Sequence, residues 1–168
     1  MGTAEDIAGI AQQEDALVFD RFDEAAAFAL GVAIRERALA EKLPIVIDIQ
    51  TWDRPLFYAA MPGSTGANTD WARRKRNTVR RFYRSTYRLV LEKARPDRTF
   101  PPGEGLDPAD YVLAGGGFPI TVREAGVVGV SAVSGLPERQ DHAVVVDALC
   151  DLLGKPRMDF ALPPVAGE

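Results

Sequence analysis

The sequence is poor in the residues from which disulfides and metal sites are built. It has one cysteine, Cys150, and one histidine, His142, among 168 residues. A lone cysteine cannot form an intrachain disulfide, and the multi-cysteine frameworks that hold zinc are absent. One histidine likewise cannot build a multi-histidine metal site. We therefore expect a reduced, cytoplasmic protein without a metal site of its own.

Long hydrophobic runs are also missing. Uncharged stretches such as residues 112–122 and 125–137 contain glycine and are shorter than the roughly 20 residues that cross a bilayer. The acidic N-terminal stretch has no signal-peptide core, so we expect no association with a membrane. The hydrophobic and charged fractions, 46% and 26%, are typical of a globular protein. The length indicates a single domain over residues 1–154, followed by an extended, proline-rich arm over residues 155–168.

Charge is spread unevenly along the chain. Residues 67–95 carry ten Lys/Arg and two acids, a balance of +8, whereas the whole chain carries −4, which leaves −12 elsewhere. Such a basic segment suits an anionic ligand, an interface between subunits or a solvated helix face. The acidic balance of the whole chain and the lack of a recognition module argue against nucleic acid as a partner.

Hydrophobic periodicity and turn residues predict the order αβαββαββα. We expect helices over 4–14, 23–42, 67–95 and 138–153, and strands over 17–22, 45–52, 55–61, 118–122 and 127–133. Asp23 is expected to cap the second helix, in which Phe28, Val32 and Leu39 recur at helical spacing. Short connections between the strand pairs predict a five-stranded, mostly antiparallel sheet flanked by helices, an α/β (α+β) fold.

Lys75 is the most informative residue of the basic segment. On a helical projection it falls between Trp71 and Val79, inside the apolar arc, whereas most of the arginines fall opposite. A cation buried there without a partner is prohibitively costly. Either its ammonium reaches a buried carboxylate such as Asp48, or it lies at the rim of a pocket and binds the carboxylate of a ligand.

Three further positions are candidates for a site. Asp48 interrupts an apolar strand, so it pairs with Lys75 or Arg54, or faces water by strand alternation. Gly115, Gly116 and Gly117 precede a strand rather than a helix, so they are not a dinucleotide fingerprint. They permit either the close approach of a flat ligand or a bulged start to the strand. Ser134 is expected to cap the last helix, with anion binding as the alternative.

His142 shares a face of the last helix with three aliphatic residues. It is either a core residue or, next to Asp141, a functional group. A single histidine suffices as an axial haem ligand, with Met61 and Cys150 as weaker alternatives. The nucleophile elbow of serine hydrolases is absent, so the residues assemble no recognisable catalytic triad.

Three stretches together resemble a known family. They are VIDIQTWDRPLFYAAMPG, WARRKRNTV and GGGFPITVREAGVVGVSAVSGLPERQDH, which begin at Val46, Trp71 and Gly115. Over residues 17–154 the chain resembles the haem-binding-protein/GlcG-like family, the "haem-degrading domain", and most of all its branch in bacteria and fungi. The resemblance implies a profilin-like, three-layer α/β/α fold around a five-stranded sheet, and assembly into a homo-oligomer.

The resemblance also implies where a site would lie. Positions that recur in the family fall here on Asp48, Lys75, Gly115 to Gly117, Ser134-Gly135 and Gln140-Asp141. The start of the basic helix and the histidine after Asp141 depart from the haem-binding members.

From the residues and the resemblance together we expect a pocket for a small anionic ligand, with haem or another tetrapyrrole as a candidate cofactor. Trp71 and Phe118 would form its apolar walls, Lys75 would pair with a carboxylate, and His142 would be an axial ligand or a polar contact. One alternative is a non-enzymatic, oligomeric interaction module that uses the basic helix over 67–95 and the C-terminal arm. Another is an enzyme with His142 and Lys75 as acid and base.

Overall fold

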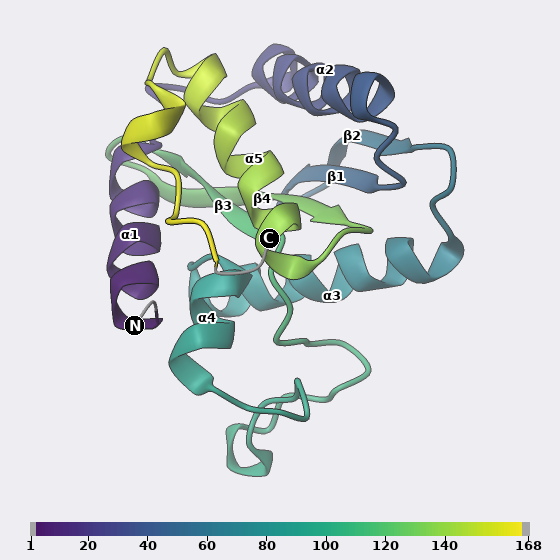
Figure 1. The fold of residues 1–168 in the computed structure, drawn as a ribbon, viewed down its shortest axis with the longest axis vertical. Coiled ribbons are helices and arrows are strands. Elements are labelled where there is room, and N and C mark those ends of the chain that lie inside the picture. Colours follow the sequence, from purple (N-terminus) through teal and green to yellow (C-terminus); the bar gives the residue numbers. More distant parts are fainter. Residues whose placement is uncertain (1–2, 166–168) are drawn as a thin grey trace.

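The computed structural model describes residues 3–165. It shows a four-stranded antiparallel sheet with helices on both faces (Figure 1). The strands lie in the order β2-β1-β4-β3. They are β1 (Val46–Thr51), β2 (Pro55–Ala60), β3 (Gly117–Val122) and β4 (Gly126–Ser134). The helices are α1 (Thr3–Ala16), α2 (Glu24–Glu41), α3 (Gly66–Phe82), α4 (Thr86–Lys93) and α5 (Glu138–Leu152). Short 3₁₀ turns occur at Pro102–Glu104 and Arg157–Asp159.

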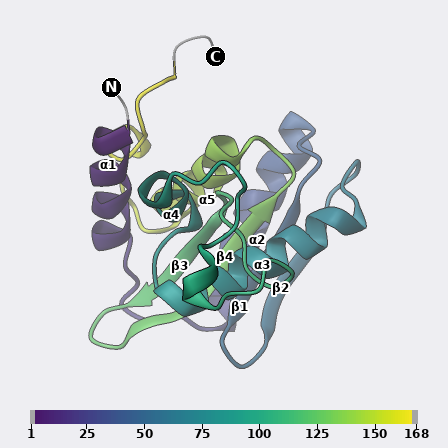
Figure 2. The same cartoon turned by 90° about the horizontal axis from the view of Figure 1, so that it is seen from below.

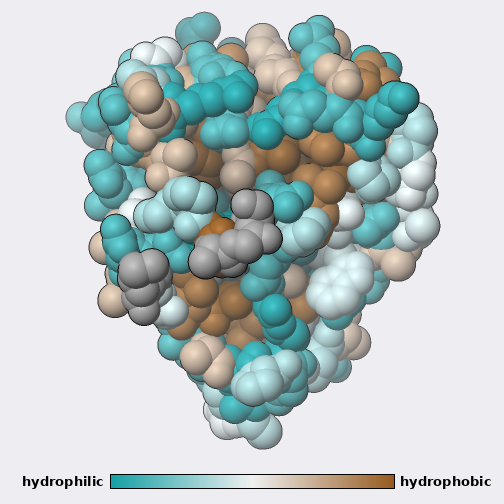
Figure 3. Space-filling view, in the orientation of Figure 1, coloured by the Kyte–Doolittle hydropathy of each residue, from teal (hydrophilic) through white to brown (hydrophobic). Residues whose placement is uncertain are grey.

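Strand alternation sends apolar side chains to both faces of the sheet, which gives three layers. The larger core lies between the sheet and helices α2 and α5, and the smaller one between the sheet and α3. Helix α1 stands at the β3 side of the sheet, next to α4 (Figure 2). The face seen in Figure 1 is largely hydrophilic, with hydrophobic surface showing below α2 and in a second place lower on the molecule (Figure 3). No helix in the described part of the chain is long and apolar enough to cross a bilayer.

The predicted hairpin at Asp53-Arg54 is confirmed. Strand β1 pairs antiparallel with both β2 and β4, with Asp48 opposite Tyr58 on one side and Ala132 on the other. The sheet is antiparallel throughout its named strands, as expected.

The prediction of a fifth strand over residues 17–22 is wrong. Only a single parallel bridge joins Phe19 to Val122, through bonds of Phe19 with Thr121 and Arg123, so the sheet has four strands among the described residues. Leu17 and Phe19 are nonetheless buried, which explains their strand-like alternation. Residues after Phe19 do not continue to pair with β3, because the chain turns into α2 at the Asp23 cap.

The single basic helix predicted over residues 67–95 is also wrong. The chain forms two helices, α3 and α4, separated at Tyr83, which has a left-handed backbone (φ 55°). The Ser85 side chain caps α4 by accepting from the N–H of Arg88. A serine that bonds the backbone locally competes with helix continuation, so the projection of one long helix fails beyond Phe82. Tyr83 is consequently 57% exposed.

Helix α2 begins as predicted, because Asp23 accepts a 2.9 Å hydrogen bond from the N–H of Ala26. Its core face differs from the one that the apolar spacing indicated, since Phe28 and Leu39 are 61% and 47% exposed. The buried positions are Ala27, Leu30, Gly31, Ile34 and Ala38. Small residues bring the helix close to β2: a methyl group on Gly31 would overlap the ring of Phe57.

The C-terminal arm lies against its own domain. Gln13 Nε2 donates a 2.7 Å hydrogen bond to the carbonyl of Phe160, and Arg139 donates to the carbonyl of Pro163. The arm therefore contacts α1 and α5 as far as Pro163, and residues 166–168 lie outside the described part of the chain.

Candidate functional site

Lys75 points inward from α3, as the helical projection predicted. Its side chain is 3% exposed, and its ammonium donates to the carbonyl of Val133 at 2.9 Å and to Asp141 Oδ2 at 3.1 Å. The counter-ion is thus Asp141 of α5. The expected partner Asp48 lies elsewhere, because it points from β1 toward the next residue of α3, Arg76.

Asp141 occupies the first turn of α5, where backbone N–H groups favour a carboxylate. It accepts from the N–H groups of Gly135 and Leu136 as well as from Lys75. Burial raises the pKa of Asp141 to about 6, although Lys75 and the two backbone N–H groups oppose this shift. Burial likewise lowers the pKa of Lys75, against the attraction of Asp141. The pair joins α3 to α5, and each of the two side chains is the counter-ion of the other.

A pocket of about 280 Å³ opens beside this ion pair. It is lined by Asn68, Trp71, Lys75, Ala114, Ser134, Gly135, Leu136, Glu138 and Asp141. Lys75, Ser134 and Asp141 are almost completely buried, whereas the Trp71 indole is partly exposed, with the Arg74 guanidinium 4.2 Å from its ring centre. The arrangement offers an ammonium, a hydroxyl and a flat apolar wall to one small molecule.

The glycine triplet lies behind Lys75 rather than in the pocket lining. Gly116 has a φ of +131°, and a methyl group there would overlap the carbonyl oxygen of Val133 and lie 2.8 Å from Lys75 Nζ. The N–H of Gly117, the first residue of β3, donates to Thr86 Oγ1 at 2.9 Å. The close approach that the triplet permits is therefore to the ammonium of this chain's own lysine.

Ser134 is not the cap of α5, which corrects the prediction. The helix starts after Pro137 without a side-chain cap, and Asp141 takes the N–H groups that precede it. Ser134, the last residue of β4, instead lines the pocket.

Asp48 lies in a separate groove and is 4% exposed. It binds Arg76 and accepts a 3.1 Å hydrogen bond from Gln50 Nε2. The predicted pairing with Lys75 or Arg54, and the alternative that it faces water, are both wrong, because α3 covers this part of the sheet with an arginine.

His142 and Phe118 lie in the core on the α5 side of the sheet, not in the Lys75 pocket. His142 is 1% exposed, and its Nε2 lies 2.7 Å from Gln13 Oε1. Because the Gln13 amide nitrogen donates to Phe160, its oxygen accepts, so His142 carries its proton on Nε2. Nδ1 has no partner in the described part of the chain. Burial lowers the pKa of His142 to about 3, so the ring is neutral.

The other two candidate haem ligands are buried as well. Met61 and Cys150 are 4% and 0% exposed and pack in the larger core. Burial raises the pKa of the Cys150 thiol to about 11. Among residues 3–165, no group of three histidine, cysteine or acidic side chains is placed to hold a metal ion.

Sequence reasoning did not identify Asp141 as the partner of Lys75, although its position in the first turn of a predicted helix was a usable signal. It also missed the cluster in which Arg139 binds Asp6 at 2.7 Å and Tyr87 at 3.2 Å. These residues are separated by up to 133 positions in the sequence, so no local pattern predicts that they meet.

The basic segment is largely neutralised within the chain. Eight of its ten cations form ion pairs with acids of the described residues, and Arg80 and Arg81 are the two that do not. Arg88, for example, binds Glu14 of α1 and Glu92 of its own helix. The acidic excess outside the segment is thus partly consumed by folding.

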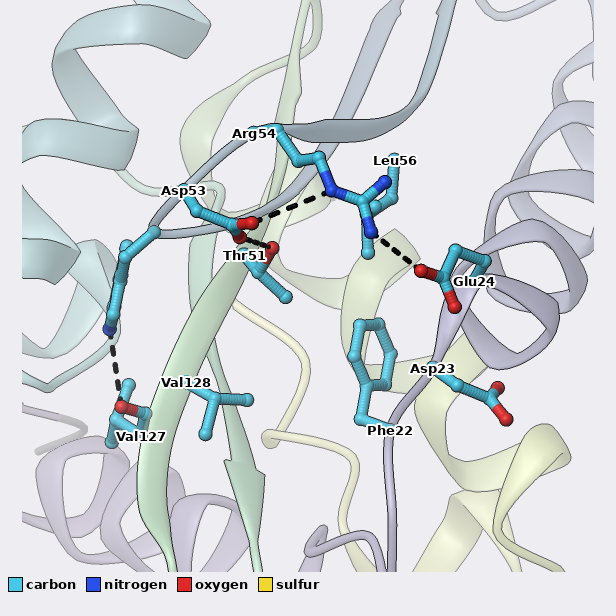
Figure 4. A pocket seen from close by; sticks show the side chains of 10 residues that line it. Phe22, Asp23, Glu24, Thr51, Asp53, Arg54, Leu56, Val127 and Val128 are labelled. Carbon is cyan, nitrogen blue, oxygen red and sulfur yellow. Dashed lines mark hydrogen bonds and ion pairs between the residues drawn. The ribbon is translucent and has the colours of Figure 1, made fainter.

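A larger depression of about 500 Å³ lies near the β1–β2 turn (Figure 4). Its charged side chains already have partners, since Arg54 binds Glu24 at 2.6 Å and Asp53 at 3.5 Å, and Asp23 caps α2. The Trp52 indole N–H also donates to the carbonyl of Val127. This depression therefore offers a ligand fewer free polar groups than the Lys75 pocket does.

Comparisons with known proteins match nearly the whole domain. The family model described as "Haem degrading protein HbpS-like" matches residues 22–150. A UPF0303 protein of Mesorhizobium japonicum is 71% identical over 154 residues, which are 92% of each chain. The crystal structure of Ybr137w superposes with a TM-score of 0.79 at 26% identity, over 88% of this chain and 87% of that one. The PduOC–heme complex superposes with a TM-score of 0.63 at 22% identity, over 79% and 94% of the two chains, and shows a shared fold.

Proposed function

Because this chain belongs to the family of HbpS-like haem degrading proteins, we propose that it binds a small carboxylate-bearing molecule in the Lys75 pocket. The observation that carries the proposal is the buried Lys75 ammonium beside the Trp71 indole. An ammonium has three N–H donors, and Val133 and Asp141 use two of them, which leaves one for a ligand. The Ser134 hydroxyl adds a second polar contact at the same inner end.

The charges around the pocket are compatible with a single ligand carboxylate. Glu138 at the rim is paired with Arg98, and Asp141 is paired with Lys75. Arg74 over the Trp71 ring adds a nearby cation. The ligand class is thus a molecule with one carboxylate next to a flat apolar part that can stack on the indole.

A tetrapyrrole meets part of this description. Its propionates suit Lys75 and its flat face suits Trp71, and a related fold has been solved as a haem complex. The pocket is at the lower end of the size range of small-molecule sites, so it would hold one edge of the macrocycle. The three candidate iron ligands do not fit, because His142, Met61 and Cys150 are buried away from the pocket lining. We therefore propose that any tetrapyrrole is held by its carboxylates and face, without iron ligation by these residues.

The test uses a single-tryptophan reporter. In Trp52→Phe, Trp71 is the one remaining tryptophan. Haem, metal-free protoporphyrin and a panel of small aromatic carboxylates are titrated while tryptophan fluorescence and melting temperature are measured. We expect at least one of them to quench Trp71 and raise the melting temperature.

Three variants locate the binding. Ser134→Ala and Trp71→Phe should weaken binding several-fold by the melting-temperature readout, whereas His142→Ala should leave the affinity for haem and its Soret band unchanged. The exposed Met158→Ala is the matched neutral control. If no carboxylate, haem and protoporphyrin included, binds at millimolar concentration, or if the two pocket variants bind as well as wild type, the proposal fails.

The alternative is a non-enzymatic interaction module, for which we first expected the basic helix over 67–95 and the C-terminal arm to form the binding surface. In the structure these two elements are already engaged within the chain. The basic helices are mostly paired within the chain, and the arm lies on α1 and α5. Exposed apolar side chains occur instead on α2, where Phe28 and Leu39 are 61% and 47% exposed.

A further inference from the structure

The Lys75–Asp141 pair has the parts of an activated amine. Lys75 Nζ lies 3.1 Å from Asp141 Oδ2, so the carboxylate is within hydrogen-bond reach of the lysine nitrogen. Asp141 is in turn held in place by the N–H groups of Gly135 and Leu136. A nucleophile, an adjacent base and a third group that orients the base are the arrangement by which enzymes activate a weak nucleophile. The pair has this arrangement at the inner end of a pocket rather than in a sealed core.

The surroundings of Lys75 favour the neutral amine more than water does. Burial lowers its pKa, whereas the attraction of Asp141 and, less strongly, of Glu138 opposes the shift. Glu138 is itself bound to Arg98, which reduces its effect on the amine. Burial also raises the pKa of Asp141 to about 6. The pKa values of the amine and the carboxyl are thus closer together than in water, so a proton passes between them more easily.

The third bonding position on Lys75 Nζ is left for a molecule in the pocket. The carbonyl of Val133 accepts from Nζ at 2.9 Å and Asp141 accepts at 3.1 Å, which uses two of the three N–H groups. When the ammonium loses the third proton, the lone pair of the amine takes its place. Trp71 precedes Lys75 by four residues on α3, so its indole lies on the same face of the helix and forms a flat wall of the pocket.

We propose that Lys75 is a nucleophile that forms an imine with a small aldehyde or ketone in this pocket. The ammonium first releases its third proton to water. The lone pair then attacks the carbonyl carbon, and Asp141 carries a proton from the nitrogen to the carbonyl oxygen, which gives a neutral carbinolamine. The proton released in the first step returns through Asp141, and the hydroxyl leaves as water while a C–N double bond forms. In sum, one ammonium and one carbonyl give one protonated imine and one water, without an oxidant or a reductant.

The site also fits the product. The protonated imine keeps its positive charge on nitrogen, so Asp141 remains its counter-ion and no buried charge loses its partner. The pocket of about 280 Å³ and the Trp71 indole select a small molecule whose carbonyl is next to a flat part. The reaction rests on the proposed function in one respect, because it requires a small molecule to enter the Lys75 pocket.

The test is reductive trapping with benzaldehyde and sodium cyanoborohydride at pH 7, followed by peptide mapping by mass spectrometry. Cyanoborohydride reduces an imine to a stable secondary amine, so each lysine that forms an imine gains a benzyl group. The chain has four lysines, which mapping separates from one another and from the α-amino group: Lys42, Lys75, Lys93 and Lys155. An ordinary lysine, with a pKa of about 10.4, is almost wholly protonated at pH 7. We expect Lys75 to be labelled at least about tenfold faster than the exposed Lys155, because burial favours its amine and the pocket holds the aldehyde beside it.

The controls separate the folded site from ordinary lysine chemistry. In urea, Lys75 should be labelled no faster than Lys155. Lys75→Arg keeps the charge but cannot form an imine, so the fast labelling should disappear, whereas Lys155→Arg is the matched control and should leave the rate at Lys75 unchanged. Mapping of the wild type gives the deciding rate even if Lys75→Arg does not fold. The proposal is overturned if Lys75 of the folded protein reacts no faster than Lys155, or no faster than it does in urea.

Benzoate distinguishes this reaction from the carboxylate binding proposed above. It resembles benzaldehyde in shape but cannot form an imine, and it should slow the labelling of Lys75 by occupying the pocket. Fast labelling of Lys75 in a protein that binds no carboxylate would uphold the imine and overturn the proposed function alone. Quenching of Trp71 fluorescence by a carboxylate, without fast labelling of Lys75, would do the reverse.

Discussion

At the residue scale, the stability of the domain depends on the buried ion pair of Lys75 with Asp141. Both side chains are almost fully removed from water, and each bonds backbone groups as well as its partner. Removal of one partner leaves a buried charge without a counter-ion, which destabilises the fold. Replacement of both by apolar residues leaves no buried charge and costs much less stability. The pair is also the inner end of the pocket, so stability and binding depend on the same atoms.

We expect Lys75→Met to lower the free energy of unfolding by about 3–5 kcal/mol, because Asp141 is left buried without its cation. The double variant Lys75→Met/Asp141→Leu should recover most of that loss, since no unpaired charge remains. Urea denaturation measures both. Arg81→Met, which removes an exposed arginine without an ion pair among the described residues, should stay within about 0.5 kcal/mol. Equal losses in the single and double variants would contradict this account.

His142 should make stability depend on pH in acid. Its pKa is about 6.5 in the unfolded chain and about 3 when folded, because burial opposes its charged form. The stabilisation is therefore fully present above pH 6.5 and is lost as pH falls toward 3, by up to about 1.4 kcal/mol per pH unit.

The measurement is the difference in unfolding free energy between wild type and His142→Asn at a series of pH values. This difference should shrink steadily below pH 6.5. Asp141, whose folded pKa is raised to about 6, contributes stability that is present below pH 3.8 and lost as pH rises through 6. Both proteins contain Asp141, so its opposite trend cancels. A difference that does not vary with pH would show that the ring is not buried as a neutral group.

At the scale of elements, the start of β3 decides whether the site can form. The chain passes from the loop into the strand directly behind Lys75, and a side chain on Gly116 would collide with both the Val133 carbonyl and the Lys75 ammonium. The positive φ of Gly116 adds a backbone reason for glycine at the same position. One residue thus couples the strand to α3 and α5.

Gly116→Ala should destabilise the protein by more than the roughly 1–3 kcal/mol of backbone strain, because the added methyl group also displaces Val133 or Lys75. Gly103→Ala, where a methyl group meets nothing within 4 Å, is the matched control and should change stability by less than about 0.5 kcal/mol. Thermal and urea unfolding decide between them. A tolerated Gly116→Ala would mean that the strand can start further from the lysine.

Elements with local signals were predictable from the sequence, and those set by long-range packing were not. The Asp23 cap, the hairpin at Asp53-Arg54 and the inward side of Lys75 each follow from a few neighbouring residues. The break at Tyr83 depends on Ser85 and on how α4 meets α1, and the loss of the strand over 17–22 depends on where α2 must begin.

At the scale of the whole molecule, helix α2 carries a line of apolar side chains, Phe28, Val32 and Leu39, of which Phe28 and Leu39 are 61% and 47% exposed. Phe28, Val32 and Leu39 have the spacing of a buried face, while Ala27, Gly31 and Ala38 provide the contact with the sheet. The expected assembly of the chain into a homo-oligomer would link folding to association if it buries these side chains. The melting temperature of wild type should then rise with protein concentration, and that of Leu39→Glu should not. Scanning calorimetry over a hundredfold concentration range checks this, and a wild-type melting temperature independent of concentration would contradict it.

The sequence by itself determined the α/β class with an antiparallel sheet, the helices α1, α2 and α5, the hairpin at Asp53-Arg54, and the inward direction of Lys75. These properties follow from periodicity and local hydrogen bonding, which act over a few residues. Only the tertiary structure decided that the partner is Asp141, that Asp48 binds Arg76, and that His142 lies in the core beside Gln13. Each of these pairs joins distant parts of the chain, and their meeting depends on how helices pack on the sheet, which no short stretch of sequence encodes.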